Sequence, residues 1–119
     1  MGKILVVEDN ETIRSLFKQI LISNGFEVIE AANGEEALQL YEELEEKPAL
    51  IILDHLMPKK NGLEVTQELL ERYSHRNILI ITGHPNVEVD CFAEQSIKLK
   101  LKPISVDEFL TEIRGMVQT

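Results

Sequence analysis

Three carboxylates stand at the ends of two apolar runs of the sequence. Asp54 ends the run Leu50–Asp54, and Glu8 and Asp9 follow the run Lys3–Val7. Apolar runs of this kind are typical of strands buried on both faces of a parallel sheet. The carboxyl ends of such strands share one edge, with neighbours about 4.8 Å apart, so the carboxylates can converge. Because they repel one another unless a cation joins them, these oxygen ligands favour Mg²⁺ or a similar hard ion.

A hydroxyl and an ammonium group stand at the ends of two later runs. Thr82 ends the run Asn77–Thr82, and Lys102 follows Ile97–Leu101. Beside a cation and its carboxylates, these two groups suit a ligand that carries phosphoryl oxygens. Each residue alone has an ordinary structural explanation, because Asp ends strands and caps helices and Lys-Pro is a common loop dipeptide. All five at equivalent strand ends favour a functional site instead.

Helical patterns separate the apolar runs. They extend from Ile13 to Leu21, from Asn33 to Leu44, from Val65 to Tyr73, from Asn86 to Ser96 and from Ser105 to Val117. With a further short strand at Phe26–Glu30, the alternation predicts an α/β fold, a single five-stranded parallel sheet with five helices on both faces. Ile97–Leu101 alternates strictly between apolar residues and lysine, which predicts an edge strand with one solvated face. The spacing leaves the rest of the strand order open.

The composition is that of an acidic globular chain, with one domain expected over residues 1–119. Of 119 residues, 21 are acidic and 12 are basic, so the formal charge is −9. This surplus disfavours binding to nucleic acid and to anionic membranes, because both require Lys and Arg. Cys91 is the only cysteine, which excludes an intrachain disulfide. No apolar run is long enough to span a membrane and the first residues do not form a signal peptide, so a cytoplasmic setting is expected.

Six short motifs follow one another along nearly the whole chain. They are Ile4–Asn10, Ala32–Leu38, Asp54–Pro58, Asn61–Glu64, Ile81–Gly83 and Lys102–Pro103. Each motif is weak alone, but in this order they resemble a response-regulator receiver domain of two-component signalling. The resemblance implies a flavodoxin-like fold with strand order 2-1-3-4-5, which agrees with an edge position for Ile97–Leu101.

The resemblance also implies roles for the carboxylates. Asp54 is the implied phosphoacceptor, whose carboxylate takes a phosphoryl group in line from a histidine kinase or a phosphotransfer protein. Asp9 and Asp54 are implied to bind Mg²⁺ directly, together with the main-chain carbonyl of Leu56, and Glu8 is implied to bind it through water. The ion screens the repulsion between carboxylate and phosphate. Such a domain catalyses only its own phosphorylation and dephosphorylation and is otherwise not an enzyme.

A conformational switch is implied as well. Lys102 is implied to pair with one phosphoryl oxygen and Thr82 to hydrogen-bond another, and a phosphoryl group adds roughly two negative charges. As these side chains move toward it, the face formed by residues 86–96, 97–101 and the last helix changes, and a protein partner binds the changed face. The resemblance implies a monomer or a weak phosphorylation-dependent dimer, either standing alone or excised from a longer regulator.

One departure from the family pattern concerns this switch. The family usually carries an aromatic residue three positions before the lysine, where this chain has Leu99. Leucine has no hydroxyl and no large ring to swing, and the segment Thr82–Lys102 is slightly shorter than usual. The alternative hypothesis is therefore a degenerate receiver that acts as a phosphorylation-independent interaction module. Lys98 and Lys100 are expected to protect the edge strand against aggregation.

A cofactor binder or hydrolase on the same fold is a third hypothesis, which the sequence disfavours. A phosphate-binding first loop offers backbone amides at the N-terminus of a helix. Here Glu8, Asp9 and Glu11 place negative charge at that position. The sequence also contains no P-loop, no G-x-S-x-G and no G-x-G-x-x-G motif.

Overall fold

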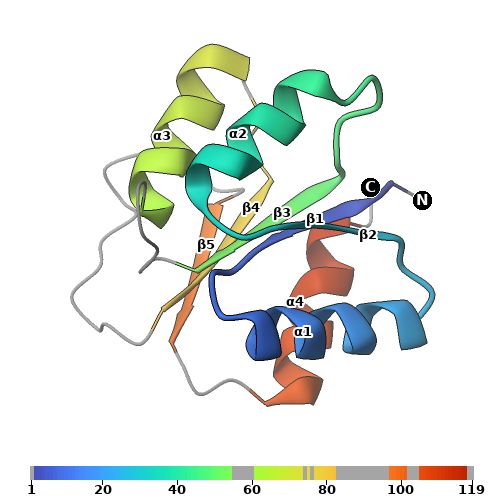
Figure 1. Ribbon diagram of the computed structural model, residues 1–119. Helices are drawn as coiled ribbons and strands as arrows, with labels where there is room; N and C mark the ends of the chain where they lie inside the picture. Colours follow the sequence, from blue (N-terminus) through green and yellow to red (C-terminus); the bar gives the residue numbers. More distant parts are fainter. Residues whose placement is uncertain are drawn as a thin grey trace.

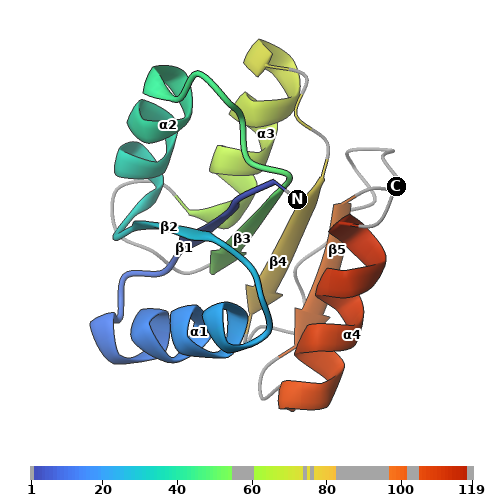
Figure 2. The same ribbon diagram turned by 90° about the vertical axis from the view of Figure 1, so that its right-hand side faces the viewer.

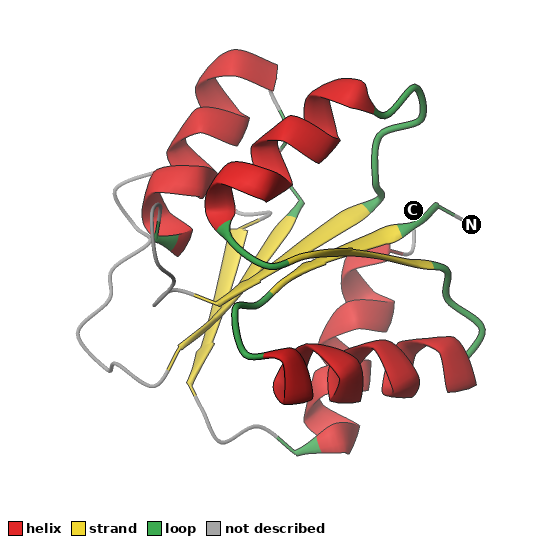
Figure 3. Ribbon diagram, in the orientation of Figure 1, coloured by secondary structure: helices red, strands yellow, loops and turns green. Residues whose placement is uncertain are grey.

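Strands and helices alternate along the chain in the computed structural model, which describes residues 2–54, 61–73, 75, 77–82, 97–101 and 105–117 (Figure 1). In chain order they are β1 (Ile4–Val7), α1 (Glu11–Ser23), β2 (Val28–Ala31), α2 (Gly34–Glu43), β3 (Leu50–Asp54), α3 (Gly62–Tyr73), β4 (Ile78–Thr82), β5 (Ile97–Leu101) and α4 (Val106–Val117). The described part of the chain thus holds four helices (Figure 3). The helix expected at residues 86–96 lies outside it. None of the described helices is long and apolar enough to cross a membrane.

The five strands form one parallel sheet in the order β2-β1-β3-β4-β5. This confirms the predicted parallel sheet, the strand order implied by the family resemblance and the edge position of β5. Helices α2 and α3 cover one face of the sheet, and α1 and α4 cover the other (Figures 1 and 2). Because all five strands run in the same direction, their carboxyl ends open on one edge of the molecule.

β3 lies at the centre of the sheet and is buried along its whole length. Leu50 and Ile52 belong to the core under α1 and α4, whereas Ile51 and Leu53 belong to the core under α2 and α3. Since side chains alternate between the two faces of a strand, the continuous apolar run supplies both cores. Burial of each such side chain contributes roughly 1.5–3 kcal/mol. Asp54 therefore ends a central strand that is packed on both faces.

The end of α1 forms a Schellman motif, which also explains where β2 begins. Gly25 has a φ of 89°, the left-handed conformation that favours glycine at a helix end. The N–H of Phe26 donates to the carbonyl of Leu21 at 3.0 Å, and the Phe26 ring packs into the core under α1 and α4. Because Phe26 closes the helix in this way, β2 begins at Val28, two residues after its predicted start.

The lysines of the edge strand β5 lie against α4. Lys100 Nζ lies 3.0 Å from a carboxylate oxygen of Glu112 and 3.5 Å from one of Glu108. Lys98 Nζ lies 3.9 Å from Glu112. The hydrogen bond to Glu112 is the main cause of the raised pKa of Lys100. The lysine face of β5 is thus partly exposed, as predicted, and carboxylates of α4 cover the rest. The expected protection against aggregation stays a prediction.

Candidate functional site

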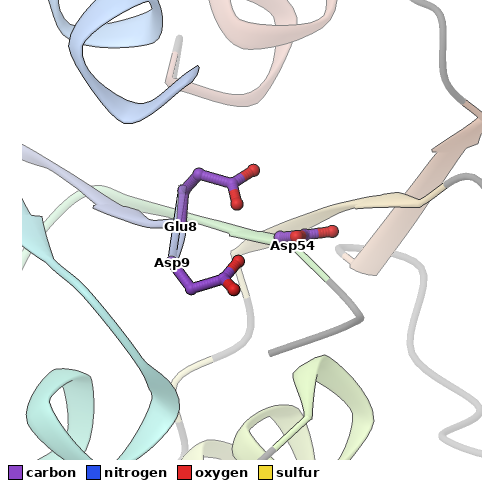
Figure 4. Close-up of side chains that lie close together, drawn as sticks. All are labelled: Glu8, Asp9 and Asp54. Carbon is purple, nitrogen blue, oxygen red and sulfur yellow. The ribbon is translucent and has the colours of Figure 1, made fainter. Parts of the chain in front are cut away.

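The carboxylates of Glu8, Asp9 and Asp54 meet at the carboxyl edge of the sheet, as the strand ends predict (Figure 4). One oxygen from each carboxylate lies within 4.8 Å of those from the other two. The parallel register produces this meeting, because Val7 of β1 pairs with Leu53 of β3 and a carboxylate follows each of them. The chain thus gathers three side chains from positions up to 46 residues apart (54 − 8).

Burial makes this cluster electrostatically demanding. The exposed fraction is 1% for Glu8 and 8% for Asp54, while Asp9 is exposed to solvent. Two unit charges 4.8 Å apart repel by about 3 kcal/mol at an effective dielectric constant of about 20. Three ionised carboxylates this close are therefore unfavourable unless a cation or a proton neutralises part of their charge.

The donor set fits Mg²⁺. Among the described residues the cluster offers only carboxylate oxygens, the ligand type that this hard ion prefers, and no sulfur or imidazole. In an octahedral shell at 2.0–2.1 Å, oxygens lie about 3 Å apart when adjacent and about 4.2 Å apart when opposite. Since the oxygens of the cluster lie within 4.8 Å of one another, the three carboxylates would hold the same ion, directly or through water.

Hydrogen bonds at the start of α1 hold the end of β1 in place. The side chain of Asn10 accepts from the N–H of Ile13 at 3.0 Å and caps the helix. The N–H of Asn10 in turn donates to Glu8 Oε2 at 3.2 Å. Arg14 Nη1 donates to the main-chain carbonyl of Glu8 at 2.8 Å. The cap and the arginine therefore fix both the carboxylate and the backbone of Glu8.

Arg14 belongs to none of the six sequence motifs. Arg14 and Lys18 are one helical turn apart on α1, and both pair with Glu30 of β2, at 3.5 Å and 3.2 Å. Their spacing of four residues indicates a basic stripe on α1. Only the fold shows that this stripe faces β2. The contact of Arg14 with Glu8 could therefore not be predicted from the neighbouring sequence.

Thr82 occupies the predicted position at the end of β4. It is fully buried, and Asp54 pairs with the residue before it on the neighbouring strand. Leu101, the last residue of β5, pairs with Thr82, and Lys102 follows Leu101 in the sequence. Lys102 and Leu56 lie outside the described residues, and their assigned roles stay predictions.

Sequence comparisons place these features in a known family. The family model of the response regulator receiver domain matches residues 4–114. The chain is 34% identical over 125 residues to the transcriptional regulatory protein CpxR of Klebsiella pneumoniae subsp. pneumoniae, and the match covers 99% of this chain and 50% of CpxR. The chain thus spans about half the length of that relative. It is also 34% identical over 122 residues to the polar-differentiation response regulator DivK of Brucella anthropi, with 94% of this chain and 93% of DivK covered.

A solved structure agrees with the sequence match. The response regulator protein TrrA from Thermotoga maritima, in complex with Mg(2+)-BeF, has a TM-score of 0.85 and 31% sequence identity to this chain. The superposition covers 98% of this chain and 99% of TrrA. The match over residues 4–114, the relatives and the shared fold together show that the chain belongs to the response regulator receiver domains, the phosphoacceptor signalling domains of two-component systems.

Proposed function

We propose that residues 1–119 form one receiver domain and that Asp54 is its phosphoacceptor. The observation that carries this proposal is the position of Asp54, which ends the buried central strand within 4.8 Å of Glu8 and Asp9. Three carboxylates held together in this way suit a bound cation. A site that holds a cation beside a fixed carboxylate suits phosphoryl transfer, where positioning and charge neutralisation supply most of the catalysis.

The reaction takes a phosphoryl group from a phosphohistidine of a histidine kinase or a phosphotransfer protein. An oxygen of Asp54 forms a bond to phosphorus while the phosphorus–nitrogen bond breaks, and the histidine nitrogen keeps the electron pair. When bound, Mg²⁺ neutralises the charge that develops on the phosphoryl oxygens. Asp9, Asp54 and the main-chain carbonyl of Leu56 would hold the ion directly, and Glu8 would hold it through water.

Two further side chains bind the phosphoryl group in this proposal. The hydroxyl of Thr82 donates to one phosphoryl oxygen, and the ammonium of Lys102 pairs with another. Thr82 is buried at the end of the strand beside β3, so it lies at the same edge of the sheet as Asp54. The domain catalyses only its own phosphorylation and dephosphorylation. We expect it to act in the cytoplasm, as a monomer or a weak dimer formed on phosphorylation.

Intact mass spectrometry tests the acceptor. The protein is incubated with a small-molecule phosphodonor, with and without Mg²⁺, beside the variants Asp54→Asn and Asp107→Asn. Asp107 is an exposed aspartate in the first turn of α4 and serves as the matched control. We expect one phosphoryl group on the unsubstituted protein and on Asp107→Asn, only with Mg²⁺, and none on Asp54→Asn. Phosphorylation of folded Asp54→Asn to the same extent would show that the acceptor lies elsewhere.

We further propose that the donor protein binds the exposed face of α1. This helix begins two residues after Asp9. Leu16 is a large apolar residue on it with 52% of its surface exposed. Leu16 borders a shallow hollow of about 450 Å³ together with Glu11, Thr12, Ser15 and Gln19. On a chain of charge −9, a face with one carboxylate and an apolar anchor lets a protein dock with little charge repulsion.

The variant Leu16→Asp separates docking from chemistry. We expect it to slow transfer from the cognate protein donor at least tenfold, about 1.4 kcal/mol, which is the usual threshold of an interface anchor. Phosphorylation by a small-molecule donor should not change. Ile22→Asp makes the same kind of change at an equally exposed position six residues further from the site. Equal slowing with both donors, or by both variants, would contradict docking at Leu16.

An interaction module that is independent of phosphorylation is the second candidate, and Leu99 favours it. Leu99 packs against the core under α2 and α3, where an aliphatic side chain has no ring to swing and no hydroxyl to exchange partners. The test compares backbone amide chemical shifts of the phosphorylated and unphosphorylated protein along β5 and α4. Shifts confined to the neighbourhood of Asp54 would support this candidate. Shifts spread over β5 and α4 would support the switch.

A further inference from the structure

A histidine and a tyrosine are hydrogen-bonded at the edge of the sheet opposite the carboxylates. The hydroxyl of Tyr41, on α2, lies 3.0 Å from Nδ1 of His75, which follows α3. Nε2 of His75 lies 3.2 Å from the carbonyl oxygen of Asn77, at the start of β4. The main-chain N–H of His75 donates to the carbonyl of Leu69 in α3 at 2.9 Å. One residue thus contacts two helices and the entry to a strand.

The partners of the ring determine which nitrogen carries its proton. The carbonyl oxygen of Asn77 can only accept, and it also accepts from the N–H of Ile51 at 3.1 Å. Nε2 of His75 must therefore be the protonated nitrogen. In the neutral ring Nδ1 is then an acceptor, and the hydroxyl of Tyr41 donates to it. Both hydrogen bonds are satisfied together only in this tautomer.

A second proton on the ring disturbs this arrangement. It would add to Nδ1 and point at the hydroxyl of Tyr41, whose own hydrogen then has to turn away. The rings of Tyr41 and His75 meet edge to face at 5.3 Å, and Tyr73 packs on Tyr41 at 4.8 Å. Two cations already lie over these tyrosines, Lys47 at 4.8 Å from the ring of Tyr41 and Arg72 at 5.3 Å from that of Tyr73. A charged imidazole is thus opposed by burial.

The same segment also joins the opposite face of the sheet. The side-chain amide of Asn77 donates to the carbonyl of Ala49, just before β3, and to that of Met116 in α4, both at 2.7 Å. His75 and Asn77 together therefore link the helices of both faces to the amino-terminal edge of the sheet. A loss of order at His75 would reach each of these contacts.

We propose that His75 is an acid-sensitive latch, which fastens α2 and α3 to the amino-terminal edge of the sheet only while its ring is neutral. Burial lowers the pKa of His75 below its ordinary value, and the hydrogen bond to the Asn77 carbonyl opposes this shift. Between the ordinary pKa near 6.5 and this lower pKa, the folded chain binds fewer protons than the unfolded chain. Acid therefore favours unfolding in that window, and the contribution of the latch is complete only above about pH 6.5.

Urea unfolding at pH 7.5, 6.5 and 5.5 tests the latch with two matched variants. His75→Gln keeps an N–H donor for Asn77 but does not titrate, and His84→Gln removes a histidine elsewhere in the chain. We expect the unfolding constant of the unsubstituted protein and of His84→Gln to rise, relative to His75→Gln, by up to about tenfold per pH unit below pH 6.5. An identical pH dependence of His75→Gln and His84→Gln would overturn the proposal.

An NMR titration of the unsubstituted protein supplies a second test that does not depend on any variant folding. Ring nitrogen shifts should show His75 as the Nε2–H tautomer at pH 7.5, with a midpoint below that of an unperturbed histidine. Tyr41→Phe, which removes only the hydroxyl donor, should move that midpoint upward. A midpoint at or above about 6.5, or an Nδ1–H tautomer, would overturn the proposal.

Discussion

The variant Glu8→Gln should make the protein more stable in the absence of divalent cations. Glutamine has the shape of glutamate without its charge, and its side-chain oxygen can still accept from the N–H of Asn10. The carboxylates of the cluster lie within 4.8 Å of one another. At this separation a pair of unit charges repels by about 1 kcal/mol in water and by about 3 kcal/mol at an effective dielectric constant of about 20.

The burial of each partner determines which value applies. Asp54 is 8% exposed, so its repulsion with Glu8 is closer to the upper value, while Asp9 is exposed and well screened. Ionised side chains also rotate apart, which lowers the sum. We therefore expect a gain of about 1–3 kcal/mol in the free energy of unfolding, measured by urea denaturation in the presence of a chelator.

Magnesium should reduce this difference in stability. A ligand present at a hundred times its Kd stabilises the folded state by about 2.7 kcal/mol, and the variant, which has lost one carboxylate, should gain less at the same Mg²⁺ concentration. Glu11→Gln is the matched control, because Glu11 lies in the first turn of α1 outside the cluster. It should lose about 0.3–1 kcal/mol with or without Mg²⁺. If Glu8→Gln is no more stable than the unsubstituted protein without Mg²⁺, the cluster is not under electrostatic strain.

Two further substitutions test the packing described above. Asn77→Ala removes both 2.7 Å hydrogen bonds of the side-chain amide. It should lower the free energy of unfolding by about 1–3 kcal/mol, because two carbonyls lose their donor. An unchanged urea midpoint would contradict this. Gly25→Ala places a Cβ on a residue with a φ of 89° and should lower the free energy of unfolding by about 1 kcal/mol. That Cβ would meet no atom of a neighbouring segment within 4 Å. A much larger loss of stability in thermal unfolding would therefore show that backbone strain is not the cause.

The sequence predicts the strands and the carboxylate cluster because both depend on simple local rules. The bounds of β3 and β5 agree with the prediction, since an apolar run or a strict alternation defines each strand. Glu8, Asp9 and Asp54 could be placed together because parallel strands end at one edge. The roles of Lys102 and Leu56 are implied by the family resemblance alone, and both residues lie outside the described part of the chain.

Other features could not be predicted because they depend on what covers a surface. The alternation in β5 indicates a polar face but does not reveal that Glu108 and Glu112 of α4 lie over its lysines. Tyr41 and His75 are 34 residues apart, and no local pattern indicates that they share a hydrogen bond. The start of β2 was misplaced for a similar reason, since Phe26 serves both the helix end and the core.

β3 and β5 are packed differently, which makes the centre of the sheet rigid and its β5 edge easier to deform. β3 has strands on both sides and a core against each face, so displacing it would disturb two sets of close-packed side chains. β5 has a neighbouring strand on one side only, and partly exposed ion pairs join it to α4. A change in the contacts of Asp54 is therefore not expected to displace β3 itself. We therefore expect any lasting change of shape to occur at β5 and α4, on the surface of the molecule, where a second molecule can bind.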